Sequence, residues 1–172
     1  MSAEVDAPRH LAARLAQSDV LAEAFRSVEP AYPHEGCGFI FEQDGTLELV
    51  PTRNLASELH AKDPEAHPRD GADWFEPDMK PWLRAVRRGA EPRVVLHSHP
   101  DVGAYFSVSD RRSAVYVDDD GLSQERNPGV VHLVISVRGG AADGAKLFSF
   151  STALRDFVEV AEFDAAGGLV SG

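Results

Sequence analysis

The sequence has a single cysteine, Cys37, among its 172 residues. One thiol excludes an internal disulfide and a zinc motif built from several cysteines. It also suits a protein that is kept in a reducing compartment. Because an isolated cysteine in an apolar strand generally behaves as a small hydrophobic residue, we expect no nucleophilic role for it.

Basic residues and long apolar runs are also scarce. The chain has 17 lysines and arginines against 28 aspartates and glutamates, which gives a formal net charge of −11. Nucleic-acid binding needs a basic surface, and the nearest approach to one, residues 84–89, is typical of the charged end of a helix. No apolar run approaches the ~20 residues of a membrane span, and the N-terminus lacks the pattern of a signal peptide. We therefore expect a cytoplasmic protein with no nucleic-acid or membrane partner.

What remains is the composition of a globular domain, with 43% hydrophobic and 26% charged residues. A chain of this length fits one domain and can bury a sizeable core. We expect this domain over residues 9–164, with a disordered N-terminus at 1–8 and a flexible C-terminus at 165–172.

Hydrophobic periodicity predicts an α/β fold in which helices flank a mixed central β-sheet. Helices are expected at 10–28, within 76–92 and at 107–117, and strands at 37–42, 46–52, 93–99, 130–137, 145–151 and 156–163. Whether residues 17–19 divide the first helix is left open. Two polar stretches, 56–75 and 118–129, are expected to be loops, and loops as long as the first are often functional or mobile.

Several polar residues that can bind a metal ion or take part in catalysis lie within residues 94–110, VVLHSHPDVGAYFSVSD. In an extended strand His97 and His99 point to the same face, so both imidazoles can reach one ion. Asp110 can supply a third ligand, which leaves a fourth position open as in catalytic zinc sites. The alternative is structural: Ser107 and Asp110 have the spacing of a capping box, and the histidines then form the polar end of a strand. The residues alone leave both interpretations open.

Hydrolysis at such a metal also needs a base that lies near the ion without binding it. The candidate is Glu35, just before the strand at 37–42. Nothing in the local pattern brings Glu35 to His97, so an ordinary loop carboxylate is the alternative.

Taken together, these residues resemble the JAMM (MPN+) metallopeptidases. A glutamate precedes an apolar strand; His-Ser-His-Pro follows, then six residues, a serine, two residues and an aspartate. The segment GAYFSVSD is similar to the prokaryotic branch of that family, and so are the residues Asn54, Ala56, Asp63, Pro64 and Phe75. The resemblance covers about residues 10–150.

The resemblance implies a cytidine-deaminase-like JAMM/MPN architecture and one Zn²⁺ per chain. It implies that His97, His99 and Asp110 hold the zinc. Glu35 is then the general base for the zinc-activated water, and Ser107 donates a hydrogen bond to the developing oxyanion.

The resemblance also implies a substrate class. It predicts cleavage of the peptide or isopeptide bond after the C-terminal Gly-Gly of a ubiquitin-like or sulfur-carrier protein, with E1-like or E2-like proteins of the same operon as further partners. Two other classes of function are weighed against this one. A non-catalytic MPN-type interaction module is disfavoured because all five motif residues are present. An iron oxygenase with two histidines and one carboxylate fits the ligand set, but leaves Glu35 and Ser107 unexplained.

Some residues outside the motif carry expectations of their own. Gly36 and Gly38 are expected to let the substrate backbone approach the first strand. Trp74 and Phe75 are expected in the core, and His132 is expected to be a satisfied histidine within the sheet.

The polar stretch 56–75 is expected to face a partner. Its acidic side chains suit a partner with a basic face; they are Glu58, Asp63, Glu65, Asp70 and Asp73. No role is assigned to the three loop histidines, which are His34, His60 and His67.

Overall fold

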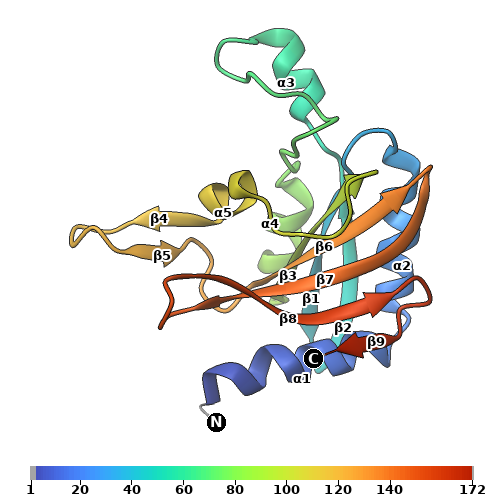
Figure 1. The fold of residues 1–172 in the computed structure, drawn as a ribbon, viewed down its shortest axis with the longest axis vertical. Helices are drawn as coiled ribbons and strands as arrows, with labels where there is room; N and C mark the ends of the chain where they lie inside the picture. The colour runs from blue at the N-terminus through green and yellow to red at the C-terminus, as the bar shows by residue number, and fades with distance from the viewer. Residues whose placement is uncertain (1–2, 172) are drawn as a thin grey trace.

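The computed structural model describes residues 3–171, with side chains from residue 7 onward, and its centre is a seven-stranded sheet (Figure 1). The strand order is β2-β1-β3-β6-β7-β8-β9. The bounds are β1 (Cys37–Gln43), β2 (Thr46–Thr52), β3 (Glu91–Pro100), β6 (Val131–Arg138), β7 (Ala141–Ser151), β8 (Asp156–Asp164) and β9 (Leu169–Ser171). Strands β3 and β6 run parallel, whereas the other neighbours run antiparallel. The predicted α/β fold with a mixed sheet is confirmed.

Helices cover both faces of this sheet. Helices α1 (Ala3–Ala16) and α2 (Val20–Val28) pack on one face, and a 3-10 turn, η1 (Glu29–Ala31), leads from α2 towards β1. The other face carries α4 (Lys80–Arg87) and α5 (Val108–Ala114). Helix α3 (Ala56–Lys62) projects from the top of the molecule in Figure 1. Among the described residues, no helix is long and apolar enough to cross a membrane.

The alternation of side chains along β3 separates the main core from the polar residues. Val94 and Leu96 face α1 and α2 and belong to the main buried cluster. Successive side chains of a strand point to opposite faces, so Val95, His97 and His99 face the side of α4 and α5. The same strand therefore contributes to the core with one face and to a polar site with the other.

Two smaller apolar clusters share the face that carries the histidines. One packs α4 on β1 and contains Phe39, Phe41, Ala85 and Ala90. The other packs α5 on β6, β7 and β8 and contains Phe106, Ala114, Val134, Phe148, Phe150 and Phe157. The middle of the sheet thus lies between two separately packed helices, which leaves room there for a site.

Regular secondary structure extends into both terminal ranges. Helix α1 already begins at Ala3, inside the range 1–8 that was expected to be disordered, because Leu11 and Leu15 further along the helix anchor it in the core. Within 165–172, strand β9 pairs with β8, with Leu169 opposite Phe163. Residues 1, 2 and 172 lie outside the described part of the chain.

One question that the sequence left open is answered, and two predicted elements change. The helical segment 10–28 is divided at residues 17–19, and the stretch 56–75 begins with α3 instead of a loop. The helix predicted at 107–117 ends at Ala114. Its last residues form β4 (Val115–Val117), which pairs with β5 (Ser123–Glu125), because β-branched valines favour a strand over a helix end.

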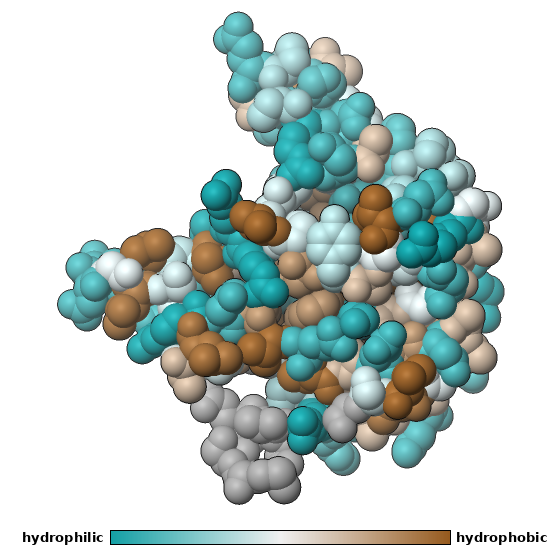
Figure 2. Space-filling view, viewed as in Figure 1, coloured by the Kyte–Doolittle hydropathy of each residue, from teal (hydrophilic) through white to brown (hydrophobic). Residues whose placement is uncertain are grey.

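The β4–β5 hairpin projects from the body at the left of Figure 1 and carries exposed hydrophobic surface (Figure 2). Val117 is 66% exposed and Leu122 is 42% exposed. The loop predicted at 118–129 is therefore partly a strand on this hairpin.

Candidate metal centre

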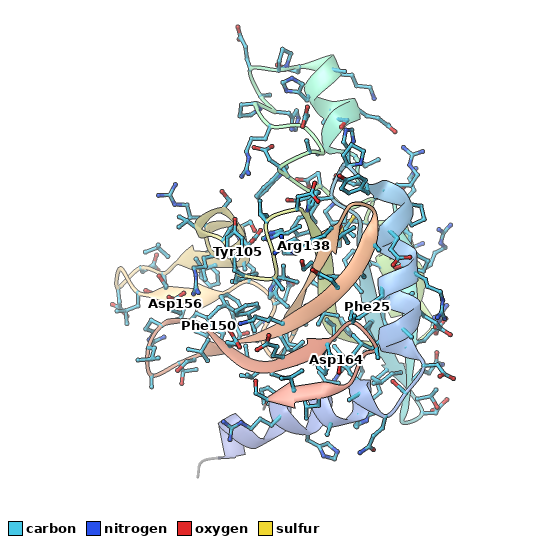
Figure 3. All side chains as sticks on the ribbon, turned by 45° about the vertical axis from the view of Figure 1, so that its right-hand side comes forward. Phe25, Tyr105, Arg138, Phe150, Asp156 and Asp164 are labelled. Atoms are coloured by element: carbon cyan, nitrogen blue, oxygen red, sulfur yellow. The ribbon has the colours of Figure 1, made fainter. Side chains whose placement is uncertain are left out.

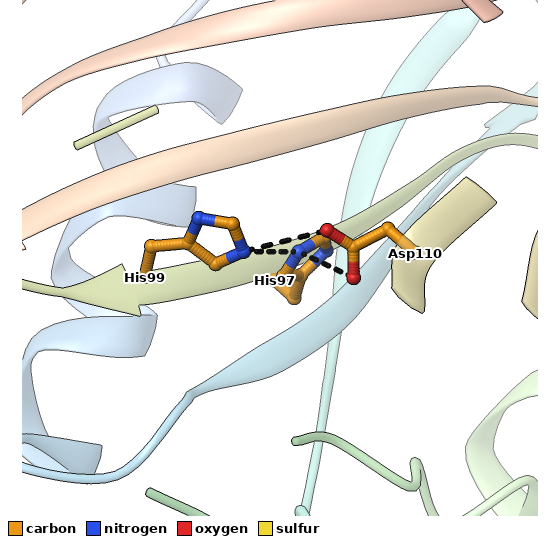
Figure 4. Close-up of side chains that lie close together, drawn as sticks. All are labelled: His97, His99 and Asp110. Atoms are coloured by element: carbon orange, nitrogen blue, oxygen red, sulfur yellow. Dashed lines mark hydrogen bonds and ion pairs between the residues drawn. The ribbon is translucent and has the colours of Figure 1, made fainter. Parts of the chain in front are cut away.

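Two imidazoles from β3 and one carboxylate from α5 converge on the same point (Figure 4). His97 Nε2 lies 3.1 Å from His99 Nε2 and 3.4 Å from Asp110 Oδ1. The other carboxylate oxygen, Asp110 Oδ2, lies 3.5 Å from His99 Nε2. Neighbouring ligand atoms of a tetrahedral zinc site are roughly 3.3–3.5 Å apart, given metal–ligand bonds of about 2.0–2.2 Å. One ligand atom from each of the three residues lies within 4.8 Å of the other two, so together they can hold one metal ion.

Packing and one hydrogen bond fix the two rings. His99 Nδ1 lies 3.2 Å from the carbonyl oxygen of Gly103, and since a carbonyl only accepts, Nδ1 carries the proton and Nε2 presents its lone pair. The ring of Phe75 stacks on His97 with a centroid distance of 4.3 Å. Tyr105, labelled in Figure 3, meets His99 edge-on at 4.8 Å. Both imidazoles are thereby held with Nε2 towards Asp110.

Asp110 is held by the start of α5. The Ser107 hydroxyl accepts a hydrogen bond from Asp110 N at 3.1 Å, and Ser107 N donates to Asp110 Oδ2 at 2.8 Å. This is a complete capping box. The structural interpretation of Ser107 and Asp110 and the chemical one therefore coincide, because the cap aims the carboxylate at the histidines.

The pKa shifts of His97 and Asp110 favour the protonation states that a metal requires. Burial lowers the pKa of His97, which is 0% exposed, although Asp110 opposes this effect. Burial by itself would raise the pKa of Asp110, but its interactions with His97, His99 and Ser107 outweigh burial and hold that pKa far below its usual range. A neutral imidazole and an ionised carboxylate can bind a cation without first losing a proton.

Glu35 lies beside this cluster, although it is distant in the sequence. Its backbone N–H donates to Gly71 O at 2.6 Å, and its carbonyl oxygen accepts from Asn54 Nδ2 at 2.9 Å. The side chain is only 6% exposed. Burial, together with the charge of Asp110, raises the pKa of Glu35 to about 8, while Arg69 opposes the increase. The structure thus brings Glu35 within electrostatic reach of Asp110.

A direct link joins the Glu35 segment to the two histidines. Gly36 N donates to Ser98 Oγ at 2.8 Å, and Ser98 N donates to Gly36 O at 2.9 Å. Ser98 lies between His97 and His99 in β3, so its buried hydroxyl ties the end of the connector to the metal-binding strand. Nothing in the sequence pattern identified this role of Ser98.

Neighbouring segments of the protein pack closely against Gly36 and Gly38. A Cβ on Gly36 would lie 2.8 Å from both Cα and Cβ of Val28 in α2, closer than real contacts allow. A Cβ on Gly38 would face Leu96 Cδ1 at 3.5 Å, which belongs to the main core and not to the site. The predicted contact of these glycines with substrate stays a prediction.

The aromatic pair Trp74–Phe75 is not part of the core, so that prediction was wrong. Both side chains are half-buried, and Arg69 lies over the Trp74 ring at 4.9 Å. Asn54 holds this segment, because its Nδ2 also donates to Trp74 O and its Oδ1 accepts from Glu76 N, both at 2.9 Å. The position of this segment could have been suspected from Asn54, because an amide side chain just before a polar stretch can bond to its backbone.

Cys37 and His132 are both buried near the site. Burial raises the pKa of Cys37 to about 12, which agrees with the expectation that this thiol is not a nucleophile. His132 packs against the rings of Phe106 and Phe157. Its buried Nδ1 has no hydrogen-bond partner among the described residues, so the prediction of a satisfied histidine was wrong.

Most acidic residues of the stretch 56–75 have partners nearby. Glu58 pairs with Arg53, and Asp73 pairs with Arg69. Asp63 Oδ1 accepts from Ala66 N at 3.0 Å, and Asp70 Oδ1 accepts from Ala72 N at 2.8 Å. Of the loop histidines, His60 Nδ1 lies 2.7 Å from His67 O, which is a contact inside the same stretch. The basic partner expected for this surface stays a prediction.

Comparisons with known proteins found a matching family and similar solved structures. The model of the family described as prokaryotic homologs of the JAB domain matches residues 17–150. The chain is similar to the solution structure of protein DSY2949 from Desulfitobacterium hafniense, with 21% identity, 81% and 84% of the two chains covered, and a TM-score of 0.55. A protein from Salinibacter ruber has 22% identity, 83% and 86% coverage and a TM-score of 0.49. No curated protein matches this sequence. Because the family model spans most of the chain and its buried His-His-Asp group is in place, the chain belongs to the prokaryotic JAB-domain family.

Proposed function

We propose that the chain is a zinc-dependent metallopeptidase. It cleaves the peptide or isopeptide bond that follows the C-terminal Gly-Gly of a ubiquitin-like or sulfur-carrier protein. One observation carries this proposal: two buried imidazoles and an ionised carboxylate converge at zinc-like distances beside a second buried carboxyl group, that of Glu35.

The donor set fits zinc. Nitrogen and carboxylate oxygen are ligands that zinc takes, and three protein ligands leave the fourth position for chemistry. His97, His99 and Asp110 would hold the ion. When bound there, zinc supplies Lewis acidity and lowers the pKa of water towards ~7.

Glu35 moves the proton in this mechanism. As an ionised carboxylate it accepts a proton from the attacking water, and it then gives that proton to the leaving amine. Its burial keeps bulk water away, and its raised pKa lies close to the operating pH, which favours both steps.

The hydroxyl proton of Ser107 is available for a hydrogen bond to substrate. Its oxygen accepts from Asp110 N through a lone pair, and the hydroxyl proton makes no bond among the described residues. Donation of this proton to the developing oxyanion is therefore compatible with the cap. One such donor typically contributes ~3–4 kcal/mol to lowering the barrier.

The substrate class rests on the family to which the chain belongs. In this proposal the extended tail of the carrier protein lies over the site, and E1-like or E2-like operon proteins are further partners. Strand β2 is an edge of the sheet, where an extended peptide can add as a further strand.

The test combines metal analysis with a cleavage assay. Elemental analysis of the purified protein is expected to give about one zinc per chain. Ubiquitin-like and sulfur-carrier proteins that end in Gly-Gly, fused to a fluorescent protein, are expected to be cut after the second glycine. Glu35→Gln is the matched control, because it keeps the shape and removes the base.

The outcomes separate the alternatives. Full cleavage by Glu35→Gln contradicts the role of the base. A protein that binds no zinc and cuts no fusion is an interaction module. Bound iron together with substrate oxidation in place of hydrolysis supports an oxygenase.

A further inference from the structure

The chain turns sharply at Asp101, directly after the strand that carries the two histidines. Asp101 follows Pro100, the last residue of β3, and lies two positions after His99. Its backbone N–H donates to Val137 O in β6 at 2.8 Å, and its φ of 61° lies in the left-handed region. Aspartate is one of the few residues that adopt this conformation at low cost. The chain therefore leaves the sheet at Asp101 and turns back towards His99.

The carboxylate of Asp101 bonds to two other segments of the protein. Oδ1 accepts from Gly139 N, in the turn between β6 and β7, at 3.0 Å. Oδ2 accepts from the hydroxyl of Tyr32, the residue after η1, at 2.9 Å. The carbonyl oxygen of Asp101 accepts from Arg138 Nη1 at 3.3 Å, and Arg138 is labelled in Figure 3. Asp101 is exposed, yet it joins this turn to segments that are distant in the sequence.

The same turn carries the acceptor that orients His99. Gly103, two residues after Asp101, accepts the Nδ1 proton of His99 through its carbonyl oxygen at 3.2 Å. Gly103 has a φ of 87°, and a Cβ on it would lie 3.4 Å from Arg138 Nη2. The position of this carbonyl therefore depends on the conformation that Asp101 and Arg138 give to the turn. Partners of this kind set the tautomer and the orientation of a metal-binding histidine.

We propose that Asp101 is a positioning residue for the metal centre. It holds the turn so that Gly103 O keeps the proton of His99 on Nδ1 and leaves Nε2 free to bind the ion. The inference rests on the proposed function, because His99 is then a zinc ligand. Asp101 acts through the turn and is not itself a ligand. An aspartate that only stabilises the fold would affect the free energy of unfolding and leave the His99 ring unchanged.

Three variants change these hydrogen bonds in steps. Asp101→Ala removes the whole carboxylate. Asp101→Asn keeps an oxygen that can accept from Gly139 N and supplies an amide that can donate to the Tyr32 oxygen, and asparagine also tolerates a positive φ. Tyr32→Phe removes a single hydrogen bond and leaves the backbone at residue 101 without new strain.

The matched control is Asp118→Ala. Asp118 Oδ1 accepts from Asp120 N at 3.1 Å and from Leu122 N at 2.8 Å, so this carboxylate also holds a turn. That turn joins β4 to β5 in the hairpin that projects from the body (Figure 1). Urea unfolding of each variant measures what the loss of a turn contributes to stability alone.

The first measurement uses chelator-treated protein and does not depend on activity. In ¹⁵N-histidine-labelled protein, the ring-nitrogen resonances report which nitrogen carries the proton, and the resonances of His99 are identified by their loss in His99→Gln. All variants are compared at one pH. We expect His99 to be protonated on Nδ1 in wild type and to become a mixture of tautomers in Asp101→Ala, because the acceptor is displaced. Asp101→Asn and Asp118→Ala are expected to keep the wild-type resonances.

The second measurement is zinc affinity, determined by competition with a chromogenic chelator. Asp101→Ala is expected to weaken zinc binding about tenfold, since partners of a histidine ligand typically contribute 10–100-fold. Tyr32→Phe is expected to weaken it about threefold, because one of the two carboxylate bonds remains. Asp101→Asn and Asp118→Ala are expected to bind zinc as wild type does.

The outcomes separate this inference from the proposed function. If zinc binds but Asp101→Ala keeps the wild-type resonances and affinity, or if Asp118→Ala weakens zinc binding equally, Asp101 is not a positioning residue and the peptidase stands. If Asp101→Ala does not fold, Tyr32→Phe decides through the same two measurements. If wild type binds no zinc and cuts no Gly-Gly fusion, the proposed function fails, whereas a changed tautomer in the metal-free Asp101→Ala protein still supports the effect of Asp101 on His99.

Discussion

Replacement of Glu35 by glutamine is expected to weaken catalysis and to stabilise the metal-free fold. Burial and the charge of Asp110 raise the pKa of Glu35 from 4.5 to about 8. The folded pKa lies above the unfolded one, so the carboxyl group costs no stability below about pH 4.5 and costs progressively more as the pH rises towards 8. Each pKa unit corresponds to about 1.4 kcal/mol, which gives a cost of ~3 kcal/mol at neutral pH. Glutamine does not ionise and avoids this cost.

The assay is urea unfolding of chelator-treated protein at about pH 5 and at neutral pH. The stability of Glu35→Gln relative to wild type is expected to increase between the two conditions, by up to ~2–3 kcal/mol. The matched control is Glu65→Gln in the exposed stretch 56–75, where the side chain has no partner among the described residues and no such increase is expected. In the zinc-loaded enzyme, kcat of Glu35→Gln is expected to fall by roughly 10²–10⁴-fold.

Two results would refute this reasoning. Equal stability of the variant and wild type at neutral pH means that the Glu35 carboxyl is not held in an apolar environment beside Asp110. Undiminished turnover means that another group takes the proton.

Three further expectations concern the same centre. Zinc binding at neutral pH is expected to release about one proton from Glu35, measured by titration calorimetry in buffers of different ionisation enthalpy, and fewer from Glu35→Gln; equal release contradicts it. Ser107→Ala is expected to lower the free energy of unfolding by ~1 kcal/mol and kcat by roughly 10²–10³-fold, and Ser107→Thr should restore both; an unchanged kcat removes the oxyanion role. Phe75→Ala is expected to weaken zinc affinity about tenfold in a competition assay, because the ring that stacks on His97 is lost; unchanged affinity means that the stack does not hold the ligand.

The sequence predicted best where a feature depends on neighbouring residues. The common face of His97 and His99 follows from the two-residue period of a strand, and the cap formed by Ser107 and Asp110 follows from local spacing. The end of the helix after Asp110 was predicted less well. Val115 and Val117 pair with residues of β5 across a hairpin. Whether they form a strand or continue the helix depends on this partner strand as much as on the valines.

The contribution of the stretch 56–75 was not predictable in the same way. Phe75 was expected in the core, yet it stacks on His97. Its position depends on Asn54, whose amide bonds to the backbone of Glu35, Trp74 and Glu76. These contacts join segments that are far apart in the chain, and no periodic pattern reports them.

The sequence by itself therefore determined the mixed α/β fold, because periodicity and turn chemistry are local properties. It identified the residues of the motif through their resemblance to a known family. Only the tertiary structure decided that Glu35 lies beside Asp110, that Phe75 stacks on His97, and that Nδ1 of His132 is buried without a hydrogen-bond partner among the described residues. The physical reason is that pKa values, stacking and unsatisfied hydrogen bonds depend on burial and on partners that the packing of distant segments supplies.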